Sequence, residues 1–526
     1  MKTKNIIFTL LIISFVNQEI IAQNWNTSFG NNGYSKIEIP NRNTRGNVLL
    51  RLNDGSLLVG INSDYNQWGA LFDRNVYIYK LNPNGIIDTT FGTNGFFFIP
   101  SGSFENISWL TSLTFSNFDN LIYCFATVSG TKKIFRMNTD GILDSSFGSS
   151  GFLNETNTGL YILLIQNDGK ILLAGCDYNN TTNQSLKRYN TNGTIDTTFG
   201  NNGVVINNLT IFNYDIVTSA KLFNDKITLV GYSYDNGEAQ SHATISRYNL
   251  NGSLDSTFGT NGGYTITNIG PENYACYRDL DINNNGEIIV AGYNIYSGGT
   301  GGWNGNKAII VKYNSDGVLE NNFNGNGIRI FDSLNNANDY FNTVSYLSDG
   351  KIVAGGSSGS PYPNIQSYYY ITKVNSDGTF NTSFFNSGYL STNFDNGVTN
   401  IAHEIITTSN DEIFSIGITK DITDSYFIAV VCKMDNTSLS NNEFSENEDY
   451  IKCYPNPVEN ILTVHSKINI KDMQLFSIDG RELEEIPINK FEDKIILNFE
   501  NLSDANYLLK ITDTNGLITT KKIIKK

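Results

Sequence analysis

A base and an acid recur along this sequence at a fixed spacing, and such a pair could form an ion pair, a catalytic couple or part of a binding site. Each base is followed two residues later by Asn or Asp, and the seven bases are Lys80, Arg136, Arg188, Arg247, Lys312, Lys373 and Lys433. The position eight residues after the first six of them holds Asp88, Asp144, Asp196, Asp255, Glu320 and Asn381. A catalytic set is expected once in a chain and not in every repeat, so we interpret these pairs as structural.

Other residues suited to chemistry show no productive spacing. The three histidines, His242, His403 and His465, are scattered and have no metal-ligand spacing. Asn314 to Gly317 resembles part of a calcium loop but lacks its alternating acids, and an ordinary Asx turn explains it. Some glycosidases work with carboxylates alone, but no two of the many acids here can be singled out. The sequence therefore identifies no catalytic residue, metal ligand or cofactor site.

The elements that position these pairs belong to a repeat. Each copy has a phenylalanine followed four residues later by glycine, and the seven anchors are Phe29, Phe91, Phe147, Phe199, Phe258, Phe323 and Phe384. Successive anchors are 52 to 65 residues apart. The first unit indicates strands near Tyr34 to Ile39, Asn47 to Leu52, Leu57 to Ile61 and Val76 to Leu81, with a hairpin turn at Asp54-Gly55.

Four strands per unit of this length favour a seven-bladed β-propeller of four-stranded repeats. The last base-bearing strand, near Phe427 to Met434, has no anchoring Phe-Gly loop after it, whereas Trp25 to Gly33 supplies one before any strand. We therefore expect the N-terminal segment to complete the last blade. A glycine recurs in the strand after the central hairpin, where it predicts a bulge or a close backbone approach, at Gly60, Gly175, Gly231, Gly292, Gly355 and Gly417.

Composition and the N-terminus indicate export. The chain of 526 residues has a formal net charge of −15, which argues against a nucleic-acid or anionic-membrane surface. Lys2 and Lys4 precede an apolar stretch from Ile6 to Val16, and residues 1–22 have the pattern of a cleaved signal peptide. The apolar stretch is too short to span a bilayer, so we expect no transmembrane segment after cleavage.

The repeats end before a second, smaller region. Residues 23–438 form the predicted propeller, residues 439–450 an acidic linker, and residues 451–526 a compact segment with alternating strands. These strands are expected near Ile461 to His465, Met473 to Ile478, Ile495 to Phe499, Tyr507 to Thr512 and Leu517 to Ile524. Their pattern predicts a small C-terminal β-sandwich.

The repeats resemble the delta-60 repeat of bacterial surface and secreted proteins. The shared pattern is NxxGxxDxTFGxxG followed by DGKIxxAG, and it covers roughly Trp25 to Ser438. The copies at Phe323 and Phe384 are degenerate. The resemblance implies an all-β, propeller-like array, and it brings no established ligand or catalytic residue.

The C-terminal segment resembles the type A sorting domain of the type IX secretion system of Bacteroidetes. The residues that carry the match are Tyr454, Pro455, Asn456, Pro457, Gly480, Tyr507 and Gly516. The resemblance implies passage across the inner membrane by the signal peptide and across the outer membrane by recognition of this domain. The implied partners are the secretion machinery and its sortase, and the passenger is then attached to the surface or released.

Three functions agree with these observations. We favour a non-enzymatic module that binds an extracellular glycan or a surface protein, since Tyr and Trp at loop tips could stack on sugars. The alternatives are a carbohydrate-active hydrolase that uses channel carboxylates and a purely structural adhesion component. Trp68, Trp109 and Trp303 are the aromatic residues considered for a binding role.

Overall fold

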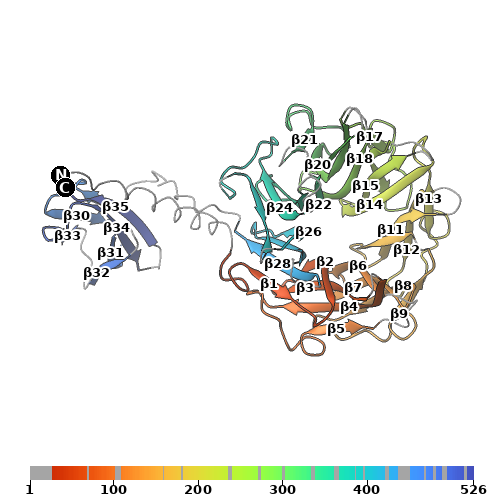
Figure 1. Ribbon diagram of the computed structural model, residues 1–526, viewed down its shortest axis with the longest axis horizontal. Coiled ribbons are helices and arrows are strands. Elements are labelled where there is room, and N and C mark those ends of the chain that lie inside the picture. Colours follow the sequence, from red (N-terminus) through yellow and green to blue (C-terminus); the bar gives the residue numbers. More distant parts are fainter. Residues whose placement is uncertain are drawn as a thin grey trace, which may run out of the picture. The chain divides into compact units, whose positions relative to one another are not determined.

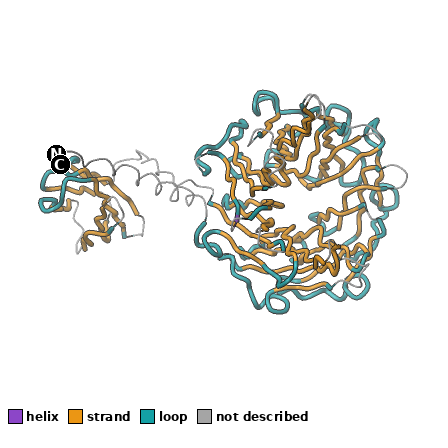
Figure 2. Tube along the Cα trace, in the orientation of Figure 1, coloured by secondary structure: helices purple, strands orange, loops and turns teal. Residues whose placement is uncertain are grey.

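The computed structural model divides the chain into two compact units, Met1–Ser438 and Leu439–Lys526. It describes residues 26–526 except 68–69, 101–107, 158, 179–181, 235–239, 271–273, 299–301, 333–337, 360–365, 386, 395–396, 421–425, 436–450, 467–468, 478–480, 488–493 and 515–517. The predicted signal peptide and acidic linker thus lie outside the described residues. Strands form the regular structure of both units (Figure 2). Within the described ranges, no helix is long and apolar enough to cross a membrane.

The first unit is a ring of seven four-stranded antiparallel sheets (Figure 1). In order from the innermost strand outward, the sheets are β2 (Asn43–Arg51), β3 (Leu57–Gln67), β4 (Ala70–Leu81), β5 (Phe96–Ile99); β6 (Trp109–Ser116), β7 (Leu121–Val128), β8 (Thr131–Met137), β9 (Phe152–Glu155); β10 (Leu160–Ile165), β11 (Ile171–Asp177), β12 (Asn183–Tyr189), β13 (Val204–Asn207); β14 (Tyr214–Phe223), β15 (Lys226–Tyr234), β16 (His242–Asn249), β17 (Tyr264–Thr267); β18 (Ala275–Ile282), β19 (Ile288–Gly298), β20 (Gly302–Tyr313), β21 (Ile328–Phe331); β22 (Asn338–Tyr346), β23 (Ile352–Gly359), β24 (Ser367–Val374), β25 (Tyr389–Thr392); and β26 (Thr399–Thr407), β27 (Ile413–Lys420), β28 (Ile428–Met434), β1 (Tyr34–Ile37). Each innermost strand contacts the innermost strands of both neighbouring sheets, so together they enclose a central channel. The fold is therefore the predicted β-propeller.

The N-terminal segment closes the ring, as the sequence predicts. Strand β1 pairs antiparallel with β28, with Tyr34 opposite Cys432 and Ile37 opposite Ala429. The Lys433 amide donates to the Gly33 carbonyl at 3.0 Å. The strand after each Phe-Gly loop is thus the outermost strand of the preceding sheet. The base-bearing strand is the fourth after the loop in chain order, as predicted, and it is third from the channel.

The arginines among the repeated bases fasten their sheet to the next one. Arg247 Nε donates to Asp255 Oδ2 at 2.8 Å, and the guanidinium carbon lies 4.3 Å from the ring centroid of the anchor Phe258. Arg247 also donates to the Ser315 carbonyl of the following sheet at 2.6 Å. All seven anchors are buried, with exposed fractions of 2% or less. These contacts support the structural interpretation of the base and acid pairs.

The pairing is less uniform than the sequence spacing predicts. Arg136 with Asp144 and Arg188 with Asp196 repeat the 2.8 Å bond, whereas Lys80 and Asp88 are 3.8 Å apart. Lys312 instead binds Glu287 at 3.1 Å. Glu287 lies just after the central hairpin of the same sheet and offers a nearer carboxylate to the Lys312 ammonium than the predicted Glu320, although the Glu320 amide still donates to the Lys312 carbonyl.

The second unit is a small sandwich of two sheets. In pairing order, the sheets are β29 (Ile451–Tyr454), β30 (Ile461–Ser466), β33 (Lys494–Asn498), and β32 (Glu482–Pro487), β31 (Ile470–Ser477), β34 (Asn506–Asp513), β35 (Ile518–Ile524). Side chains from both sheets share one apolar core, which includes Val464, Leu497, Met473 and Leu509. Strands β29 and β32 are absent from the sequence prediction. The other five strands match it within a few residues.

Candidate functional site at the mouth of the central channel

A β-bulge at the same place in every innermost strand points one side chain toward the channel. The pairing register shifts in all seven strands, and the residues at the shift are Asn47, Thr111, Tyr161, Thr218, Arg278, Asn342 and His403. A bulge residue is left out of the regular ladder, so its side chain can be redirected. The backbone of the channel lining is therefore the same in every repeat, whereas the side chain at the bulge differs from repeat to repeat.

The strand glycines allow these bulges. A Cβ atom on Gly231 would lie 1.8 Å from the Ile216 carbonyl oxygen, and one on Gly417 would lie 2.0 Å from that of Ile401. A side chain at either position would therefore clash with the backbone of the bulged strand. The second sheet has the same bulge at Thr111 with Ala126 on the neighbouring strand. The prediction that these glycines mark bulges is confirmed, with the bulge on the neighbouring strand.

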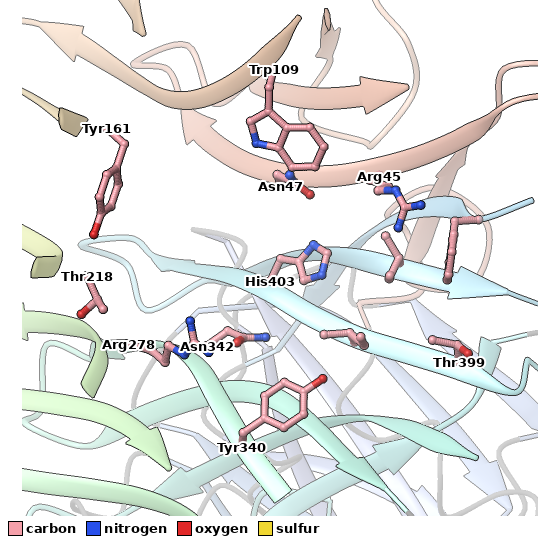
Figure 3. Close-up of a pocket in the computed structure, with 13 residues that line it drawn as sticks. Arg45, Asn47, Trp109, Tyr161, Thr218, Arg278, Tyr340, Asn342, Thr399 and His403 are labelled. Carbon is pink, nitrogen blue, oxygen red and sulfur yellow. The ribbon is translucent and has the colours of Figure 1, made fainter. Parts of the chain in front are cut away.

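Six of the seven bulge residues line a cavity of about 780 Å³ at one end of the channel. They are Asn47, Tyr161, Thr218, Arg278, Asn342 and His403. Arg45, Trp109 and Tyr340 complete much of the remaining wall. Figure 3 shows His403 between the side chains of Trp109 and Tyr340, with Tyr161 and Arg278 approaching from other strands. We call this cavity the channel mouth.

The charged groups of the channel mouth are arginines. Arg45 is paired, because its Nε lies 3.2 Å from the buried Asp64 carboxylate, and its guanidinium packs on the Phe427 ring at 4.5 Å. Arg278 is exposed to the channel and packs beside the Tyr293 ring at 5.3 Å. Among the described residues, no carboxylate forms an ion pair with Arg278, and no Asp or Glu lines the cavity.

Tyrosines from four sheets surround the Arg278 charge. Burial raises the pKa of the Tyr161, Tyr232, Tyr293 and Tyr340 hydroxyls, and the positive charge of Arg278 acts on all four in the opposite direction. These hydroxyls remain protonated at neutral pH. The guanidinium is therefore surrounded by neutral hydrogen-bonding groups and aromatic rings.

His403 is a neutral member of the channel mouth. Its Nδ1 lies 2.8 Å from the Gly46 carbonyl oxygen, which only accepts, so Nδ1 carries the proton and donates. Burial lowers the pKa of His403, and the nearby Arg45 charge lowers it further, while the hydrogen bond to Gly46 opposes both. The imidazole is thus neutral near pH 7 and leaves Nε2 as an acceptor.

Carboxylates also occur on the innermost strands, next to the bulges, but they bind neighbouring strands. Asp279 accepts from the Ser219 hydroxyl at 2.8 Å and from the Val344 amide at 3.0 Å. Glu404 accepts from the Leu49 amide at 2.5 Å. Burial raises the pKa of both carboxyls, and that of Glu404 reaches about 8. Their hydrogen bonds join adjacent sheets around the channel.

The aromatic residues considered from the sequence have different positions. Trp109 lines the channel mouth, and its ring lies 5.4 Å from the guanidinium carbon of Arg74. Trp68 lies outside the described residues, and Trp303 belongs to β20, where its side chain is not described. Sequence reasoning missed Arg278, Tyr161 and His403 as members of one site. In the described part of the chain, no group of His, Cys, Asp and Glu side chains could hold a metal ion.

The predicted sorting residues in the second unit are mostly exposed. Tyr454 has an exposed fraction of 45%, and Pro455, Asn456 and Pro457 are exposed beside it. Asn456 is fixed to β35, because its side-chain oxygen accepts from the Ile524 amide at 2.8 Å.

Tyr507 is buried in the same unit, and its hydroxyl donates to the Ser503 carbonyl at 2.7 Å. Gly480 and Gly516 lie outside the described residues. The role of all these positions in sorting stays a prediction.

Parts of both units match known families. Residues 452–526 match the secretion system C-terminal sorting domain. Residues 166–199, 224–258 and 347–384 match the domain of unknown function DUF5122, a beta-propeller. The chain therefore carries a type IX sorting domain after a repeat propeller, and it is exported by type IX secretion to the cell surface or extracellular space.

Solved structures resemble the fold at low sequence identity. A Drosophila Plexin A in complex with Semaphorin 1b has 9% identity and a TM-score of 0.41, over 76% of this chain and 86% of that one. The beta-propeller domain of the Trilobed protease from Pyrococcus furiosus has 10% identity and a TM-score of 0.39, over 74% and 94%. A PL25 ulvan lyase has 10% identity and a TM-score of 0.42, over 73% and 93%. Likeness at this level carries no information about function. No curated protein matches the sequence.

Proposed function

We propose that this exported propeller is a binding protein whose channel mouth takes an extracellular glycan. The observation that carries the proposal is the composition of the cavity wall. Trp109, Tyr161 and Tyr340 supply aromatic faces, and Asn47 and Asn342 supply amide groups. Rings that stack on sugars beside amides that hydrogen-bond to hydroxyls are a common arrangement in carbohydrate sites. A volume of about 780 Å³ has room for several sugar units.

The alternative of a hydrolase that uses channel carboxylates finds less support. Glycoside hydrolysis commonly needs two carboxyl groups about 5 to 10 Å apart on either side of the scissile bond. No carboxylate lines the channel mouth within the described residues. Asp279 and Glu404 hold backbone amides of neighbouring sheets. A carboxylate engaged in this way is poorly placed to act as an acid or a nucleophile.

The test is a binding screen of the purified protein against soluble polysaccharides and oligosaccharides. Trp109→Ala and Tyr340→Ala each remove one aromatic face of the channel mouth, and we expect each to weaken binding about 10-fold or more. Phe118→Ala is the matched control. Phe118 is an exposed aromatic residue, with an exposed fraction of 56%, and it lies in the β6 to β7 turn at the other end of its sheet.

The outcomes separate the candidate functions. Binding that is lost in the channel-mouth variants and kept in the Phe118 control supports the proposal. Shortened products, detected by mass spectrometry after long incubation, would favour the enzymatic alternative. If no glycan binds, or if all variants bind equally, the channel mouth is not a glycan site.

A further inference from the structure

We propose that the glycan bound in the channel mouth is acidic, and that Arg278 binds its carboxylate or sulfate group. This inference rests on the proposed function, because it specifies the chemistry of a ligand for the same cavity. It depends on three features: the distribution of charge, the surroundings of Arg278, and the residues that face a sugar beside it.

The charge of the channel mouth is opposite to that of the whole protein. The chain has a formal net charge of −15, yet the cavity is lined by two arginines and no carboxylate among the described residues. Because the chain has 51 Asp and Glu residues and 36 Lys and Arg residues, a set of lining residues drawn at random would contain more acids than bases. A cavity with a locally positive potential attracts anionic ligands, even though the protein as a whole is acidic.

The two arginines are not equivalent. Arg45 is neutralised by the Asp64 carboxylate, which lies 3.2 Å from its Nε. This carboxylate is buried, with an exposed side-chain fraction of 1%. Arg278 has no such partner among the described residues, and Tyr293 contacts it through the face of a ring. The neighbouring Asp279 carboxylate is held by the Ser219 hydroxyl and the Val344 amide. The charge of Arg278 is therefore the one available to a ligand.

The position of Arg278 suits an anionic group on a sugar. As the bulge residue of β18, it is exposed to the channel although its strand neighbours Tyr277 and Leu280 are buried. A guanidinium presents parallel N–H donors that match the two oxygens of a carboxylate or sulfate. Neutral tyrosines around it lower the local polarity without competing for the charge, which strengthens such a contact.

The rest of the cavity favours a sugar over an acidic peptide. His403 is neutral and presents Nε2 as an acceptor for a hydroxyl. Asn342 donates to the Ala402 carbonyl at 2.9 Å, which fixes its amide beside His403 and leaves its oxygen as an acceptor. Acceptors of this kind suit a ligand rich in hydroxyls, and Trp109 and Tyr161 offer faces for its rings.

The experiment compares matched acidic and neutral polymers by titration calorimetry. The probes are polygalacturonate and its carboxyl-reduced counterpart, which keeps the same linkages without the charge, and a sulfated galactan with its desulfated form. Arg278→Gln removes the charge, Arg278→Lys keeps it without the fork, and Lys351→Gln is the control. Lys351 is an equally charged residue that pairs with Asp349 in the β22 to β23 turn, so its loss changes the net charge without touching the channel mouth.

We expect an acidic polymer to bind at least about 10-fold more tightly than its neutral form, because a hydrogen bond to a charged group is stronger than one between neutral groups. Arg278→Gln should abolish this difference, and Arg278→Lys should restore part of it. The control variant Lys351→Gln should keep the wild-type affinity for both the acidic and the neutral polymer. The arm that shows the preference, uronate or sulfate, identifies the anionic group.

Three results would overturn the inference. Equal affinity for acidic and neutral polymers, with Trp109→Ala still weakening both, would refute the acidic ligand and leave the proposed function intact. Unchanged binding of an acidic polymer in both Trp109→Ala and Arg278→Gln would refute the two proposals together. Competition by polyglutamate as effective as that by polygalacturonate would show that the site selects charge and not an acidic sugar.

Discussion

Replacing Glu404 with glutamine should stabilise the propeller at neutral and mildly alkaline pH, and should have little effect at acid pH. Glu404 follows the bulge of β26 and accepts a hydrogen bond from the Leu49 amide, so it joins the last sheet to the first. Burial raises the pKa of its carboxyl from 4.5 to about 8. The Leu49 hydrogen bond and the Lys221 charge oppose this rise, and the Asp279 charge adds to it.

The sign follows from proton linkage. A carboxyl whose pKa is higher in the folded state binds its proton more tightly there than in the unfolded chain. Its contribution to stability is complete below about 4.5 and is lost as the pH rises through about 8. The full difference between these values corresponds to at most about 5 kcal/mol, and screening by channel water reduces it, so we expect about 2 kcal/mol. Glutamine keeps an acceptor oxygen for Leu49 and removes the charge.

Thermal unfolding followed by circular dichroism, at a series of pH values on either side of this window, measures the effect. The wild-type protein should lose stability across the window, and the Glu404→Gln variant should lose less, by about 2 °C in unfolding midpoint at the upper end. Glu412→Gln is a control of opposite sign. Burial raises the pKa of Glu412, but Lys433 and Arg51 outweigh this and lower it, so this variant should be destabilised at neutral pH.

One result would refute the reasoning. If Glu404→Gln destabilises the protein at the upper end of the window, then the carboxylate is ionised there and its attraction to Lys221 exceeds the cost of its burial. The same midpoints for wild type and variant at every pH would show that Glu404 is well hydrated in the channel.

Three further predictions concern the stability of the fold and the export of the protein. Phe199→Ala removes a buried anchor and should cost about 3 to 5 kcal/mol in a denaturation experiment, whereas Ile211→Ala, at a position with an exposed fraction of 90%, should leave stability unchanged. Gly417→Ala places a Cβ atom 2.0 Å from the Ile401 carbonyl oxygen and should lower the free energy of unfolding by about 1 to 3 kcal/mol or more. Deletion of residues 452–526 should leave the protein in the periplasm, which cell fractionation detects, and export of the truncated chain would contradict the assigned role of this domain.

The fold could be predicted from the sequence because its signals are local and repeated. A hairpin turn such as Asp54-Gly55 fixes the register of β2 and β3 without reference to the rest of the chain. The closure by β1 was also predictable, because the chain has a Phe-Gly loop at Phe29 before any strand and none after Met434. The Lys312 ion pair was not, because the choice between Glu287 and Glu320 depends on side-chain geometry that spacing does not contain.

The channel mouth could not be read from spacing, because ring closure brings together residues from opposite ends of the propeller. Arg45 and His403 both line the cavity, yet nothing in the sequence between them indicates that they meet. A usable signal was nevertheless present. Each cavity-lining bulge residue precedes a glycine of the next strand by 13 or 14 residues, as Asn47 precedes Gly60 and His403 precedes Gly417. Because the hairpin register places the bulge opposite this glycine, the spacing locates the bulge residue, which lies beside the channel.

The same geometry explains why a repeat pattern defines the fold of this protein and leaves its ligand open. The anchors and paired bases recur because every sheet needs the same fastening to its neighbour, whereas a bulge residue has no partner in the ladder and is free to vary. Six such positions are Asn, Tyr, Thr, Arg, Asn and His in chain order around the cavity. The chemistry of the channel mouth therefore depends on bulge residues that vary between repeats and do not appear in a consensus of the repeats. Among them, Arg278 has the charge that is available to a ligand.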